Sequence, residues 1–225
     1  MIYNENSLEQ IYVDFHVHTH YSKDSLLSPE KILQRIGIAA DRLAITDHNT
    51  IKGAEEVYKL DPENIIVGEE VMTTKGEILA FFVQEEVPAG LDPRKAIQLL
   101  HDQNAYISVS HPFDRYRKGS WKEKDLISIL PGIDAIEGFN ARVMSGAANK
   151  LALGFAEKHH LQITAGSDAH AYFEIGKAGI ILPRFKDADE LRKNIPKGSL
   201  VAKRSLWWVH LFSSYARYQK ERKQG

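Results

Sequence analysis

The stretch Ile11-Tyr12-Val13-Asp14-Phe15-His16-Val17-His18 joins an apolar, strand-forming run to two histidines. Side chains alternate between faces in an extended chain, so His16 and His18 project to the same side. Near the other end of the sequence, the run 161–165 leads in the same way into Ser167-Asp168-Ala169-His170. We interpret the two segments as strand ends that carry ligands of a metal site.

Working outward from these segments, apolar runs alternate with amphipathic stretches along nearly the whole sequence. This alternation is typical of repeated strand-helix units around a parallel sheet or barrel, and it predicts a single α/β domain. Besides the run 11–15, strands are expected at residues 42–46, 65–67, 78–83, 105–109, 134–137, 161–165 and 178–182. Helices are expected at residues 28–40, 92–103, 121–130, 146–160 and 187–193.

The composition narrows the class of protein. A chain of 225 residues with 43% hydrophobic and 26% charged residues is long enough for one globular domain with a large core. The net charge of -1 argues against a surface built for non-specific nucleic-acid binding. Because the chain has no cysteine, histidine, aspartate and glutamate are the ligands available to a metal ion.

Targeting signals are not visible in the sequence. The first ten residues contain no basic segment followed by an apolar stretch, as a secretory signal would. The run 78–83 is among the longest uninterrupted apolar runs, far shorter than the roughly 20 residues of a membrane-spanning helix. We therefore expect a cytoplasmic protein without a transmembrane segment.

Ionisable residues follow several of the expected strands: His48 follows strand 42–46 and His111 follows strand 105–109. In a barrel of parallel strands, residues at the carboxyl ends of different strands meet at one rim. We expect this rim to gather His16, His18, Asp24, His48, Glu70, His111, Asp168 and His170. Imidazole and carboxylate without thiolate suit divalent zinc, manganese or iron. Glu69, in contrast, is expected to face solvent.

Five ordered motifs carry a resemblance to a known family: residues 16–24 (HVHTHYSKD), 45–48 (ITDH), 68–71 (GEEV), 110–112 (SHP) and 167–170 (SDAH). With these motifs the chain resembles the polymerase and histidinol phosphatase (PHP) family of metal-dependent phosphoesterases. The resemblance implies a distorted (β/α)7 TIM-like barrel. We expect this barrel to occupy residues 1–205, and residues 206–225 to form an amphipathic helix and basic tail packed on the barrel or extending from it.

The resemblance also implies two or three divalent metal ions as cofactors. The first ion would be held by His16, His18, Glu70 and Asp168. Glu70 would bridge to a second ion that His111 also holds, and a third would lie among Asp24, His48 and His170. Many relatives use another histidine for the second ion, at a place where this chain offers Glu77. Glu77 is either an oxygen ligand, which would favour manganese, or a solvated turn residue.

The implied activity is the hydrolysis of a phosphate ester by a metal-bridging hydroxide, with Asp168 or His170 handling a proton. The substrate would be a small phosphomonoester, a nucleotide or a short oligonucleotide. Arg142, Arg115 or Arg117 would bind its phosphate, because the planar fork of arginine suits phosphate oxygens.

Several alternatives stay open at this point. The same metal cage would suit an amidohydrolase-like enzyme that cleaves carbon-nitrogen bonds, or a non-catalytic module that metal stabilises. Asp14 would either orient an imidazole or make a strand-end hydrogen bond. The aromatic and basic segment 206–223 would contact a membrane or nucleic acid, or would pack as a helix over the barrel or a partner subunit. The sequence leaves the native substrate and the oligomeric state undecided.

Overall fold

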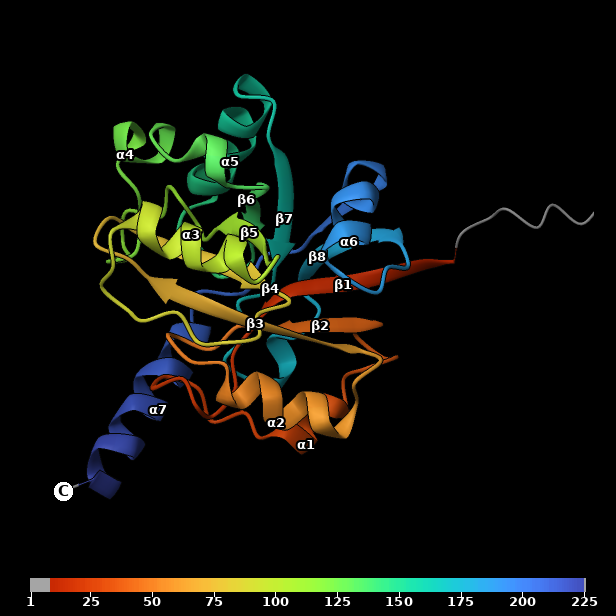
Figure 1. The fold of residues 1–225 in the computed structure, drawn as a ribbon. Coiled ribbons are helices and arrows are strands. Elements are labelled where there is room, and N and C mark those ends of the chain that lie inside the picture. The colour runs from red at the N-terminus through yellow and green to blue at the C-terminus, as the bar shows by residue number, and fades with distance from the viewer. Residues whose placement is uncertain (1–8, 225) are drawn as a thin grey trace, which may run out of the picture.

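The computed structural model describes residues 9–224, in which strands and helices alternate around one curved sheet (Figure 1). The strands are β1 Gln10–Val17, β2 Arg42–Ile45, β3 Ile65–Met72, β4 Glu77–Phe81, β5 Tyr106–Val109, β6 Ala135–Asn140, β7 Gln162–Gly166, β8 Ala178–Pro183 and β9 Ser199–Ala202. The α-helices are α1 Pro29–Leu33, α2 Lys52–Leu60, α3 Pro93–Asp102, α4 Glu123–Ile127, α5 Gly146–Lys158, α6 Ala188–Asn194 and α7 Val209–Gln224.

The sheet has nine strands in the order β7-β6-β5-β4-β3-β2-β1-β8-β9 and closes almost completely into a barrel. Closure occurs just after β7, where Val17 and Ala169 form a parallel bridge and the His18 amide donates to the Ala169 carbonyl over 2.9 Å. The expected α/β barrel in a single domain is confirmed. The two histidine-bearing segments therefore meet because the ends of the barrel meet.

The sheet is not purely parallel, and β9 was not expected. β4 pairs antiparallel with both β3 and β5, and β8 pairs antiparallel with β1 and β9. A tight turn explains the first reversal, because the Thr73 amide donates to the Gly76 carbonyl over 3.0 Å. A connection this short permits a hairpin, whereas a parallel crossover needs a dozen or more residues.

Two helices are shorter than expected. The helix predicted over 28–40 ends at Leu33, and Gly37 lies beyond it with a φ of 72°, a left-handed conformation that does not continue a helix. The helix predicted over 121–130 spans Glu123–Ile127 and is followed by a 3-10 turn that contains Pro131. These changes lie outside the rim and leave the predicted site in place.

An apolar core supports the sheet. The rings of Phe15 and Phe81 lie 5.2 Å apart in one of its buried clusters, with Tyr106 stacked 6.0 Å beyond Phe81. Helices α1 and α2 lie together on one side of the sheet and α3 to α5 on another, whereas α7 lies apart from them (Figure 1). Among residues 9–224, none of the helices has the length and apolar character needed to cross a bilayer.

Candidate metal centre

His16 and His18 form the centre of the site, at the carboxyl end of β1. Their Nε2 atoms lie 3.0 Å apart. Oδ1 of Asp168, from the segment after β7, lies 3.8 Å from His16 Nε2 and 3.4 Å from His18 Nε2. All three side chains are fully buried, and their donor atoms lie close enough together to share one ion.

The chain fixes the orientation of both imidazoles through their other ring nitrogens. His16 Nδ1 lies 2.9 Å from Glu137 Oε1. His18 Nδ1 lies 3.0 Å from Ser22 Oγ, which in turn donates to Asp47 over 2.5 Å. An Nδ1–H that donates outward leaves Nε2 with its lone pair directed into the site, the tautomer that a metal ligand needs.

Glu70 connects this centre to the rest of the site. It lies within β3, whereas the sequence predicted a strand that ended at Val67. Its Oε2 lies 2.9 Å from His48 Nδ1 and 3.4 Å from His16 Nε2. Its Oε1 lies 3.1 Å from His111 Nε2. Glu70 therefore stands between two groups of imidazoles, where one carboxylate can serve two ions.

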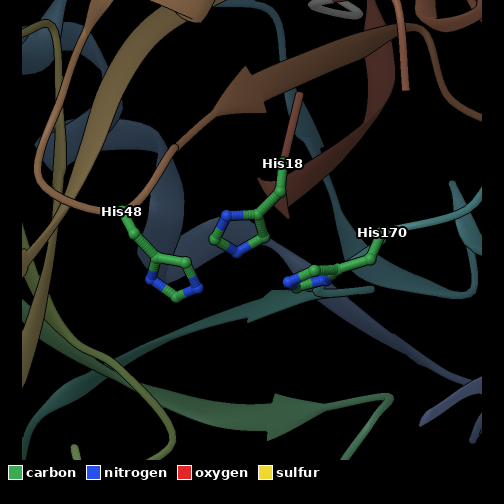
Figure 2. A group of neighbouring side chains, drawn as sticks. All are labelled: His18, His48 and His170. Carbon is green, nitrogen blue, oxygen red and sulfur yellow. The ribbon is translucent and has the colours of Figure 1, made fainter. Parts of the chain in front are cut away.

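A second group of imidazoles consists of His18, His48 and His170, whose rings converge in Figure 2. The His18 ring centroid lies 4.5 Å from that of His48 and 4.3 Å from that of His170. Asp24 Oδ1 adds a carboxylate 3.2 Å from His170 Nε2 and 3.7 Å from His48 Nε2. Asp24, His48 and His170 are the residues predicted for a third ion, and the structure places His18, which was predicted for the first ion, beside them.

Glu77, at the start of β4, points into the site. Its Oε2 lies 3.5 Å from His111 Nε2 and its Oε1 lies 3.9 Å from His48 Nδ1. With His48 and Glu70 it forms another group that can hold an ion. Because Glu77 is buried, the alternative of a solvated turn residue does not describe it.

We call the nine converging side chains the cage: His16, His18, Asp24, His48, Glu70, Glu77, His111, Asp168 and His170. Three of its carboxylate oxygens, Asp24 Oδ1, Glu70 Oε2 and Asp168 Oδ1, are buried and, apart from their imidazole contacts, have no hydrogen-bond partner within residues 9–224. A buried carboxylate without donors is costly, and a cation removes that cost. The nitrogen and oxygen donor set fits divalent ions.

The pKa values reflect this concentration of charge. Burial opposes ionisation of Glu70, but His16 and His48 hold its pKa well below the usual value. Burial disfavours the cation of His48, yet Glu70 and Asp24 raise its pKa to about 10. Glu70 is thus ionised and ready to bind cations at neutral pH, whereas an ion that binds His48 must displace a proton.

Two cage residues have strained backbones. His111 has a φ of 21° and Asp168 a φ of 55°, which non-glycine residues rarely adopt. Glu137 supports the first of them, because its Oε2 accepts from the His111 amide over 2.8 Å. Such strain concentrates at functional sites, where the surrounding structure holds it in place.

Glu137 is the functional residue that the sequence analysis missed. It closes the predicted strand 134–137, so the rule that selected the other carboxylates at strand ends was able to find it. Asp14 does not orient an imidazole. Its carboxylate accepts from the backbone amides of Ser167 and Gly176 over 2.8 and 2.9 Å, the strand-end alternative. Glu69 was expected to face solvent, and this prediction is wrong. Its side chain is buried, and its carboxylate accepts from the Val87 amide.

The three arginines considered for phosphate binding lie in different surroundings. Arg117 reaches the cage, with Nη2 2.5 Å from Asp168 Oδ2 and Nη1 3.2 Å from His111 Nε2. Arg115, two residues earlier on the same loop, is exposed and lines a separate hollow. Arg142 is buried, and both of its terminal nitrogens are engaged by other protein groups.

A cavity of about 470 Å³ opens beside the cage. Its lining includes cage residues and the cations Arg117, Lys118, Arg142 and Arg217. A volume of this size is typical of small-molecule sites. The fold and the site together define an α/β barrel with a candidate metal centre beside a cation-lined cavity.

Two protein-family models match the sequence of this chain. The PHP domain model matches residues 14–165, and a model described as PHP-associated matches residues 146–200. The chain belongs to the PHP domain family. It is also 37% identical to the uncharacterised protein MJ0417 of Methanocaldococcus jannaschii over 173 residues, which cover 75% of this chain and 69% of that protein.

Solved structures share the fold at low sequence identity. PsfC from Pseudomonas syringae is 17% identical with a TM-score of 0.69, over 94% of this chain and 99% of that one. A two-domain protein from Bacteroides vulgatus, which contains a predicted PHP-like metal-dependent phosphoesterase, is 15% identical with a TM-score of 0.70, over 87% and 65%. The lesion-specific endonuclease PfuEndoQ from Pyrococcus furiosus is 16% identical with a TM-score of 0.56, over 85% and 58%.

Proposed function

We propose that this protein is a metal-dependent hydrolase of phosphate esters that acts on a small phosphorylated molecule. The observation that carries the proposal is the set of buried carboxylate oxygens without hydrogen-bond partners, which face imidazoles in the cage. Membership of the PHP family supports the same chemistry. The arginine beside the cage favours a phosphate over a neutral amide as the bound group.

The cage residues divide among the ions that we propose. His16, His18, Glu70 and Asp168 would hold one ion, and Glu70 would share a second with His111 and Glu77. Asp24, His48 and His170 would hold a third. When bound, divalent ions activate water as a nucleophile and withdraw charge from phosphoryl oxygens.

The other tasks belong to side chains of the chain. Arg117 is the arginine that we assign to the phosphate, since its guanidinium lies at the cage and lines the cavity. Arg142 instead has a structural role, because its terminal nitrogens already donate to Glu174 and to Ser213. Asp168 and His170 are the candidates for proton transfer. His170 Nδ1 lies 2.8 Å from the Asp168 carbonyl, so Nε2, 3.2 Å from Asp24 Oδ1, is the nitrogen left for proton transfer.

The test is phosphate release by the purified protein, assayed after chelation and after reloading with zinc, manganese or iron. The panel would contain phosphomonoesters, phosphodiesters, oligonucleotides and amide substrates. We expect hydrolysis of phosphomonoesters by the reloaded protein only. Asp168→Asn should lower kcat/KM by roughly 10²- to 10⁴-fold, the size of removing one charge from a buried ionic cluster.

Asp102→Asn is the matched control, because Asp102 is exposed on α3, outside the cavity lining. It should leave the rate unchanged. The proposal is wrong if metal-loaded protein releases no phosphate from any ester, or if Asp168→Asn and the parent protein have the same rate. Hydrolysis restricted to amides would favour the carbon-nitrogen alternative.

A further inference from the structure

The C-terminal helix α7 forms one wall of the cavity beside the cage. The cavity lining includes His210, Ser213, Ser214 and Arg217, all from α7. Their spacing of three, four and seven residues places them on one face of the helix. A single polar face of α7 therefore looks into the space that the metal centre also faces.

The polarity of α7 is the reverse of what packing against a core requires. A helix that covers an apolar core turns its apolar stripe inward and its polar residues outward. In α7 the large apolar side chains Leu211 and Tyr215 are 60% and 55% exposed, while the polar residues line the cavity. Among the α7 side chains that the structure describes, the buried apolar ones are the small Val209 and Ala216. This pattern indicates a helix that lines a polar site.

Polar contacts hold α7 against the cage at three points along its length. Arg142 Nη2 donates to Ser213 Oγ over 2.8 Å near the start of the helix. Further along, Arg217 Nη2 lies 3.3 Å from Asp24 Oδ2. Lys220 Nζ donates to the carbonyls of His20 and Ser22, on the loop that carries Asp24. The helix thus has a defined position relative to the metal ligands.

Arg217 is the residue of this wall whose guanidinium has N–H donors that do not bind other protein groups within residues 9–224. A guanidinium has five N–H donors. Within the described part of the chain, the Arg217 side chain makes a single polar contact, to Asp24. Lys118, from the loop after β5, lines the same cavity. After Arg117 and the cage have bound a reacting phosphate, these two cations remain for another part of the substrate.

We propose that α7 is the specificity wall of the site, and that Arg217 binds a second anionic group of a small phosphate ester while the helix excludes polynucleotide chains. The inference rests on the proposed hydrolase function and adds the class of substrate. The half-open cavity of about 470 Å³ has the volume of a small-molecule site, and α7 bounds it, whereas proteins that bind single strands use an open groove that follows the backbone.

The experiment compares two esters that differ in one charged group, glycerol 3-phosphate and 3-phosphoglycerate, together with a 5′-phosphorylated single-stranded oligonucleotide. The metal-loaded, full-length protein should prefer 3-phosphoglycerate and should leave the oligonucleotide uncleaved. Arg217→Ala should raise KM for 3-phosphoglycerate roughly 10- to 100-fold, the loss of a charge-assisted hydrogen bond, with kcat little changed. Its effect on glycerol 3-phosphate should be small, and Arg217→Lys should restore part of the preference.

Arg222→Ala is the matched control, since Arg222 lies on the same helix over the Tyr218 ring and outside the cavity lining. It should change neither constant. Equal losses on both esters, or a fall in kcat with loss of bound metal, would mean that Arg217 acts through Asp24 and would overturn the inference. Rapid cleavage of the oligonucleotide would overturn the exclusion. If the parent protein hydrolyses no ester at all, the proposed function fails first, a result independent of any variant.

Discussion

The donors at the centre of the cage and those at its outer edge are held in different ways. The inner donors, His16, His18, Glu70, His111 and Asp168, have side chains with no solvent exposure. The outer donors Asp24, His48 and Glu77 are 14%, 27% and 9% exposed. Glu137 and Ser22 contact the Nδ1 atoms of His16 and His18, and Glu137 also accepts from the backbone amide of His111.

The inner donors form the part of the site that the fold itself positions. The inner donors come from β1, β3 and the segments directly after β5 and β7, so the closure of the barrel sets their spacing. Asp24 and His48 lie in loops, and Arg217 of the C-terminal helix contacts Asp24. We therefore expect the inner donors to bind ions tightly and the outer donors to bind an ion that is easier to remove.

The largest effect is expected from Glu70→Gln, because the Glu70 carboxylate contacts both the inner His16 and the outer His48. The loss of this charge leaves His16 and His48 without their main counterion, so both groups should lose affinity for metal. We expect kcat/KM to fall roughly 10²- to 10⁴-fold, as for other broken buried charge clusters. Metal content after dialysis and phosphate release measure the two effects.

Glu69→Gln is the neighbouring control for that variant. Glu69 is buried on the same strand, but its carboxylate accepts from the Val87 amide instead of facing the cage. The glutamine retains an acceptor for that bond, so metal content should not change. Equal metal loss in both variants would show that any change in β3 disturbs the site, and would remove the distinction drawn for Glu70.

A smaller effect is expected from Glu137→Gln, which tests how the inner donors are oriented. Glu137 contacts His16 Nδ1 with one oxygen and the His111 amide with the other. Changes in groups that orient metal ligands lower metal affinity or activity about 10- to 100-fold. Titration with the proposed metal, followed by kcat/KM at saturating metal, measures both. Unchanged metal affinity would contradict the role of Glu137 in positioning these ligands.

Much of the inner group follows from the sequence because strand ends obey simple geometry. The period of two places His16 and His18 on one face, and a barrel brings Asp168 beside them. Glu70 was placed just after its strand but lies within β3, since the hairpin between β3 and β4 extends the pairing. The reversal of β4 had no signal in the apolar pattern, because β4 is buried along its whole length and such a strand has a continuous apolar run in either direction.

The outer edge depends on loops and on the C-terminal helix, for which periodicity gives little information. Arg115 and Arg117 are two residues apart, yet only the second reaches the cage, since the loop that carries them has no regular repeat. The polar face of α7 was also hidden, because its exposed aromatic residues favour packing or a membrane contact when the helix is read alone. Only the structure shows that this polar face of α7 lines the cavity beside the cage.

The smallest effect is expected from Asp24→Asn, which tests the outer donors. The asparagine keeps the shape of the side chain but removes the charge next to His48 and His170, so the third proposed ion should be lost. Because the Arg217 side chain is 57% exposed, the broken ion pair should change the free energy of unfolding by less than about 1 kcal/mol. Elemental analysis should show one ion fewer per chain, with the inner ions retained. Arg217→Ala separates the two causes, since it removes the same ion pair and leaves the carboxylate. If Asp24→Asn releases all ions, the inner donors do not bind independently, and the division of the cage into two groups is wrong.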